Sequence, residues 1–161
     1  MYHPADPNTE FIELQNIGGE AINLNLVKFT KGVDFTFGDQ TLTSGQHTVI
    51  VQDQPFFEAQ YGTGLNIAGQ YIGRLANGGE RIRLEDAIGR TILDFEYSDG
   101  WRPITDGDGF SLTIIEPTND DPNSWGEKKS WRASDYIGGS PGDNDPGVLP
   151  NPGAVVINEV M

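Results

Sequence analysis

The 161-residue sequence contains no cysteine, which excludes disulfide bonds, thiolate metal ligands and a cysteine nucleophile. No apolar run approaches the roughly 18 residues of a membrane-spanning helix, so membrane insertion is not expected. Basic residues are scarce: ten Lys and Arg stand against 24 Asp and Glu, which gives a net charge of −14. Such a surface repels phosphate backbones, so nucleic acid is not an expected partner, whereas divalent cations find many carboxylates.

Long helical periodicity is also missing. The 21 Gly and 10 Pro residues separate short runs in which apolar and polar residues alternate, a pattern typical of an all-β sandwich or barrel. One short helix is expected at residues 54–61, because Pro55 occupies a first-turn position before several apolar residues. Residues 118–153 show no regular pattern. The expected strands are residues 10–14, 21–26, 33–37, 47–51, 71–75, 81–85, 91–97 and 110–115.

The chain divides into three parts. Residues 1–142 form the expected domain, and residues 143–153 form a linker that its three prolines make semi-extended. Residues 154–161 form a strand rich in branched side chains, and such a strand needs a sheet to join.

The two ends of the chain read as one strand. Placed head to tail, residues 157–161 run directly into residues 2–4, with Met1 and Met161 at the same position. We therefore expect one period of a tandem array, whose last strand completes its own sheet or that of a neighbour. The residues expected to make this interaction are Val155, Ile157, Glu159 and Val160.

Two acidic segments have a composition that suits a hard cation, because alternating Asp, Asn and Gly let several oxygens converge on calcium. An EF-hand loop is excluded, since Phe110 stands where an oxygen ligand belongs. Asx and type I turns are the simpler interpretation of the same residues. The candidate calcium ligands are Asp106, Asp108, Asp143 and Asp145.

The three tryptophans lie among polar residues, an arrangement that suits stacking on sugar rings. Anchoring of loops onto the body of the domain is the simpler role for such residues. The candidate ligand surface consists of Trp101, Trp125 and Trp131.

Residues 138–142 match the G-x-S-x-G pattern of a hydrolase nucleophile elbow. The residue after the serine is Pro141, which has no backbone N–H to donate to an oxyanion. No strand is expected before the pattern and no helix after it. The sequence therefore predicts a tight turn here and no enzyme activity.

Four segments, in order along nearly the whole chain, resemble the bacterial form of the lamin-tail domain. They are Glu10-Phe11-Ile12-Glu13-Leu14 with the Asn-x-Gly-Gly turn after it, Asp108-Gly109-Phe110-Ser111-Leu112, Trp131-Arg132-Ala133-Ser134 leading to Gly139-Ser140-Pro141-Gly142, and Ile157-Asn158-Glu159-Val160-Met161. The resemblance implies an immunoglobulin-like β-sandwich that is non-catalytic and is repeated in large exported proteins of bacteria. No coiled-coil rod is present, which separates this chain from nuclear lamins.

The expected function is therefore that of a structural or interaction module in a larger bacterial protein that is secreted or displayed on the cell surface. Its partners would be neighbouring repeats or other proteins. The alternative is a calcium-dependent adhesion or carbohydrate-binding module, with calcium as its cofactor and glycans as partners.

Overall fold

The computed structural model describes residues 1–119, 121–147 and 156–159. The protein is predominantly β, as the sequence predicts, with one α-helix among the described residues, α1 (Gln54–Tyr61). Short 3-10 turns lie at Pro7–Thr9, Asp99–Trp101, Pro103–Thr105, Pro122–Gly126 and Lys128–Ser130. The strands are β1 (Phe11–Gln15), β2 (Ile22–Asn23), β3 (Lys28–Lys31), β4 (Phe35–Thr36), β5 (Thr41–Leu42), β6 (His47–Val51), β7 (Ile67–Gln70), β8 (Arg81–Glu85), β9 (Thr91–Glu96), β10 (Leu112–Ile114) and β11 (Trp131–Ala133).

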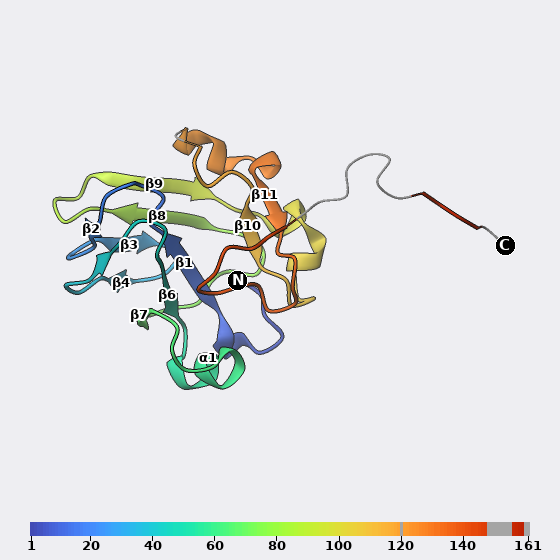
Figure 1. The fold of residues 1–161 in the computed structure, drawn as a ribbon, viewed down its shortest axis with the longest axis horizontal. Helices are drawn as coiled ribbons and strands as arrows, with labels where there is room; N and C mark the ends of the chain where they lie inside the picture. Colours follow the sequence, from blue (N-terminus) through green and yellow to red (C-terminus); the bar gives the residue numbers. More distant parts are fainter. Residues whose placement is uncertain (120, 148–155, 160–161) are drawn as a thin grey trace.

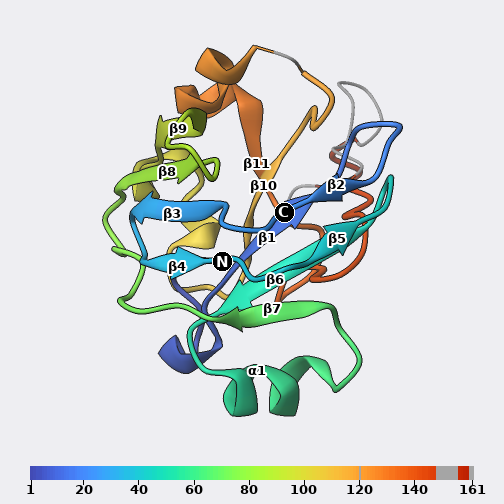
Figure 2. The same ribbon diagram turned by 90° about the vertical axis from the view of Figure 1, so that its left-hand side faces the viewer.

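Two sheets form the body of the domain and enclose the main core between them (Figures 1 and 2). One has the strand order β4-β3-β8-β9, and the other has the order β1-β6-β7, in which β1 pairs antiparallel and β7 parallel to β6. Two small pairs, β2-β5 and β10-β11, complete the described strands. Alternation along the strands turns apolar side chains inward. The core contains Phe29, Phe37, Leu42, Ile50, Ile82 and Leu84, with Ile12 and Leu14 packed against it.

The second face of the β1-β6-β7 sheet packs on α1. Phe57 is fully buried there and contacts Phe11 edge to face, with ring centroids 5.6 Å apart. The helix begins at the cap residue Asp53, whose carboxylate accepts from the Phe56 N–H at 3.3 Å, and Pro55 fits the first turn. It ends at Gly62, which has a φ of 86° that glycine adopts without strain. The helix expected at residues 54–61 is confirmed.

Several expected strands differ from those observed. Residues 71–75 form no strand: β7 ends at Gln70, and Ile72 makes only an isolated bridge to Asp34. Leu26, expected to point inward, is 54% exposed because the chain turns at this residue, with a φ of 63°. The Val27 N–H closes the turn on the Leu24 carbonyl at 2.9 Å.

The two adjacent phenylalanines of α1 test how much the packing of α1 on the β1-β6-β7 sheet contributes to stability. Phe57→Ala should lower the free energy of unfolding by about 3–5 kcal/mol, because it leaves a cavity beside β1 and β6. Phe56, which is 48% exposed, provides the matched control, and Phe56→Ala should change stability by less than about 1 kcal/mol. Urea denaturation of both variants measures the difference, and equal losses would contradict the assignment.

Candidate functional site

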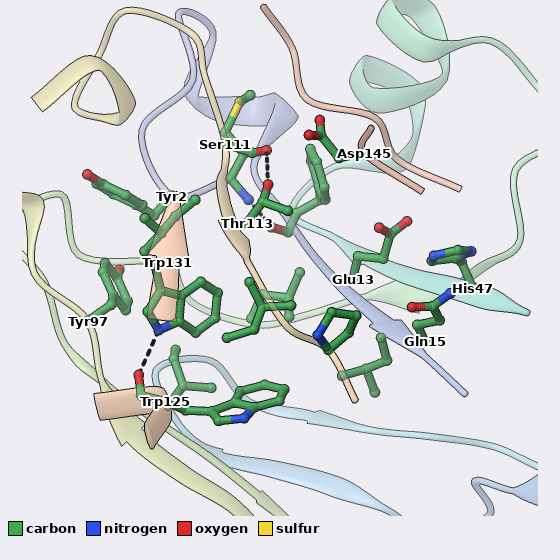
Figure 3. A pocket seen from close by; sticks show the side chains of 18 of the residues that line it. Tyr2, Glu13, Gln15, His47, Tyr97, Ser111, Thr113, Trp125, Trp131 and Asp145 are labelled. Atoms are coloured by element: carbon green, nitrogen blue, oxygen red, sulfur yellow. Dashed lines mark hydrogen bonds between the residues drawn. The ribbon is translucent and has the colours of Figure 1, made fainter. Parts of the chain in front are cut away.

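A cavity of about 360 Å³ lies between β1 and β10 (Figure 3). Every residue from 11 to 15 lines it on one side, and every residue from 111 to 115 lines it on the other. The opposite sheet contributes Phe29, Ile82 and Phe95. Among the described strands, β1 pairs only with β6 and β10 only with β11, and the cavity lies between these two strands.

The free edge of β1 follows from its hydrogen bonds to β6. The Gln52 N–H donates to the Glu10 carbonyl, and the Asn16 N–H donates to the Gln46 carbonyl, both at 3.0 Å. Backbone groups alternate along an antiparallel strand, so even-numbered residues of β1 point toward β6 and odd-numbered ones toward the cavity. The N–H and C=O groups of Glu13 and Gln15 thus face the cavity.

The same reasoning applies to β10. The Ser134 N–H donates to the Ser111 carbonyl at 2.8 Å, and the Ile115 N–H donates to the Ser130 carbonyl at 2.9 Å. Odd-numbered residues of this strand therefore face β11. The backbone groups of Leu112 and Ile114 point to the opposite edge, on the side of the cavity.

Met1 pairs with the first residue of β1 at one end of the cavity. Its ammonium group donates to the Phe11 carbonyl at 2.6 Å, and the Phe11 N–H donates to the Met1 carbonyl at 3.3 Å. The Met1 side chain packs with Phe11 on the α1 side, and Tyr2 packs in the main core. Burial lowers the pKa of the Met1 ammonium to about 5, although Glu13 and Glu10 oppose this shift.

Glu13 places a carboxyl group on the α1 side of the cavity, beside the segment 140–145. Burial raises the pKa of this carboxyl to about 7, despite a hydrogen bond from the Gly142 N–H at 2.5 Å and the nearby Met1 ammonium. Gly142 has a φ of 87°, and a Cβ there would lie 2.5 Å from Leu65 Cδ2, so glycine is required at the position that meets Glu13.

A buried ion pair between Arg132 and Asp145 holds the segment 140–145 against β11. The two side chains are 9% and 6% exposed. The Asp145 carboxylate also accepts from the Ser140 hydroxyl at 2.8 Å and from the Asp135 N–H at 3.0 Å, while Arg132 donates to the Asp145 carbonyl at 2.9 Å. Burial raises the pKa of Asp145, but the bonds from Arg132, Asp135 and Ser140 outweigh it and leave that pKa below its ordinary value.

Two of the four candidate calcium ligands serve other roles in the described chain. Asp145 is committed to Arg132, and Asp106 lies 2.6 Å from His3 Nδ1. Asp108 is exposed, and Asp143 lies at the outer rim of the cavity. The part of the chain that the structure describes contains no group of three or more His, Asp or Glu residues placed to hold a metal ion.

The three tryptophans do come together. Trp131 is 9% exposed and lies between Trp101 and Trp125, with ring centroids 6.4 and 5.8 Å away. It also stacks on Phe95 at 5.3 Å, and its indole N–H donates to the Trp125 carbonyl at 2.7 Å (Figure 3). This packing attaches the segment before β11 to β9, which is the anchoring role; Trp125 and Trp131 also line the cavity.

The expected terminal strand lies only partly within the described residues: Val155 and Val160 fall outside them. Residues 156–159 form no strand, and Val156 and Ile157 are 82% and 83% exposed. They lie away from the body of the domain (Figure 1), and they are not among the residues that line the cavity beside β1.

Sequence reasoning missed the polar groups around the cavity and the buried Glu10. The Glu10 carboxylate accepts from the Tyr71 hydroxyl at 3.1 Å and from the Leu75 N–H at 2.9 Å, and Arg74 lies 3.8 Å away. Alternation in the first strand was a usable signal, because Glu10 shares its face with Ile12 and Leu14.

The sequence matches no protein-family model and no curated protein. No described helix is long and apolar enough to cross a membrane.

The raised pKa of Glu13 predicts a pH-dependent effect of its removal. A carboxyl whose pKa is higher in the folded state contributes stability below its ordinary value of 4.5 and loses it as the pH rises through about 7. Glu13→Gln should therefore raise the free energy of unfolding by about 1–3 kcal/mol at pH 8, and much less at pH 5. Denaturation at both pH values measures this, with exposed Glu20→Gln as control; a gain that does not depend on pH would contradict it.

The buried ion pair predicts a large loss on truncation of one partner. Arg132→Ala should destabilise the fold by about 3–5 kcal/mol, because the Asp145 carboxylate stays buried without its cation. The exposed pair Lys129–Glu127 is the control, and Lys129→Ala should cost less than about 1 kcal/mol. Thermal unfolding distinguishes the two, and a small effect of Arg132→Ala would show that the segment 140–145 is held by other contacts.

Proposed function

We propose that this chain is a non-catalytic structural or interaction module that accepts a β-strand between β1 and β10. We further infer an immunoglobulin-like sandwich of the lamin-tail type, which belongs to a larger bacterial protein that is secreted or on the cell surface. The resemblance of four ordered segments supports the family and the setting. The open edges at the cavity support the mode of interaction.

The observation that carries the proposal is the pair of free strand edges on either side of one apolar cavity. Glu13 and Gln15 direct backbone donors and acceptors into it from β1, and Leu112 and Ile114 do so on the side of β10. Buried backbone polar groups are almost always paired in folded proteins. An extended peptide satisfies such groups by adding a strand, and its alternate side chains fill the apolar space.

The side chains around the cavity fit this role better than catalysis. Ser140, the serine of the G-x-S-x-G pattern, donates its hydroxyl to Asp145 and so supports the segment beside the cavity. The lining is mostly apolar on the core side, with Leu14, Leu112 and Ile114 next to the open edges. Such a lining suits the branched side chains of a β-strand.

A peptide with the sequence of residues 154–161 tests the proposal. Added in excess to the isotope-labelled chain, it should bind and slow amide hydrogen exchange at Glu13, Gln15, Leu112 and Ile114, because these N–H groups gain partners. The matched control is the same peptide with Asn158 replaced by proline, which cannot pair at that position. Unchanged exchange at all four amides with the first peptide would refute strand acceptance.

A further inference from the structure

We propose that the strand taken up between β1 and β10 is the segment 156–160 of a second copy of this chain, antiparallel to β1, with Ile157 opposite Gln15 and Val160 opposite Ile12. This inference rests on the proposed function and names its partner. It makes the chain both an acceptor, through the cavity, and a donor, through its tail.

The register follows from the pair that Met1 makes. Met1 and Phe11 exchange two backbone hydrogen bonds, so they are directly opposite in an antiparallel arrangement. In the head-to-tail frame that we expect from the sequence, Met161 takes the position of Met1. Moving back along the tail by one residue moves forward along β1 by one, which gives the donor–acceptor pairs 160 with 12, 159 with 13, 158 with 14, 157 with 15 and 156 with 16.

This register also decides which side chains face the core. Tyr2 faces the main core and Met1 faces α1, so alternation places Val156, Asn158 and Val160 toward the core. Ile157 and Glu159 then face the side of α1 and the segment 140–145. A slip by one residue would turn the Glu159 carboxylate into the apolar core, which is far more costly than placing the Asn158 amide there.

This register brings two carboxyl groups together, and the environment of Glu13 reduces the repulsion between them. Glu159 of the donor comes to lie opposite Glu13, and two carboxylates in that position repel each other. Burial of Glu13 raises its pKa to about 7, so this carboxyl is partly protonated near neutral pH and can donate a hydrogen bond to Glu159.

A second copy fits better than the chain's own tail for two reasons. Val156 and Ile157 are 82% and 83% exposed and lie away from the domain, so they are presented to another molecule (Figure 1). The sequence between the domain and the tail contains Pro146, Pro150 and Pro152, and proline-rich linkers act in general as semi-rigid spacers. Such a linker favours delivery away from the domain over a return to the cavity beside Asn144.

The resulting contact joins two different surfaces, the tail of one copy and the cavity of the next. A contact of this kind does not close on itself unless the rotation between copies forms a ring, so it builds a linear chain of molecules. Each added copy presents a new tail and a new cavity.

Cysteine cross-linking tests the partner and the register together, because the chain has no cysteine of its own. Two single variants, Gln15→Cys and Ile157→Cys, are mixed and oxidised. Residues directly opposite in an antiparallel pair have Cα atoms about 5.5 Å apart, within the range that a disulfide spans. We expect a cross-linked dimer that contains one molecule of each variant and is enriched several-fold over the dimers of either variant alone.

The matched control replaces Ile157→Cys by Asn158→Cys, which moves the thiol to the opposite face, so the mixed dimer should fall to background. Equal yields from the two mixtures would overturn the register. If the double variant Gln15→Cys/Ile157→Cys cross-links within one chain at every concentration, its own tail is the occupant and the second copy is refuted. If the peptide of residues 154–161 binds while the full chain sediments as a monomer at all concentrations, strand acceptance stands and this inference fails.

Discussion

The candidate site is defined by a gap in backbone hydrogen bonding along the outer edge of β1. β1 is bonded to β6 on one side, and on the other it has Met1 opposite Phe11 and then open positions at Glu13 and Gln15. β10 cannot close this edge, because a cavity of about 360 Å³ separates the two strands. Open edges are costly inside an apolar surface and prone to pairing with other chains. The strand that we propose would satisfy both edges at once.

Polar contacts hold the surroundings of the gap in place. The Arg132–Asp145 pair fixes the segment 140–145 to β11, and that segment then meets β1 through the Gly142 N–H and the Glu13 carboxylate. Asn144 accepts from the Gln15 side chain at 3.0 Å. The outer wall of the cavity is thus built from residues more than a hundred positions away from β1, and it brings the start of the linker to the same place.

Local patterns predicted the elements that are regular over several residues. A continuous apolar run identified β6 and alternation identified β8, both at their observed bounds, and the first-turn proline identified α1. β3 was missed because only Phe29 of its four residues is buried, and β11 because it has only three residues and is bonded only to β10. The burial of Glu10 could have been predicted from the sequence, since it shares a strand face with Ile12 and Leu14. The open edge of β1 was not, because pairing between distant strands decides which edges are free.

The proposed strand is argued from two features, the sequence of the tail and the open edge of β1 beside the cavity. The first places Met161 in the frame of Met1; the second continues the bonded pair of Met1 and Phe11 along β1. Half of all possible registers between the tail and β1 would place Glu159 in the core. The proposed register turns Val156, Asn158 and Val160 inward. It turns Glu159 toward Glu13, whose pKa is raised. In the proposed register, the branched side chains of the tail and its glutamate fit the two faces of the cavity, which supports the proposal that the tail is the strand taken up there.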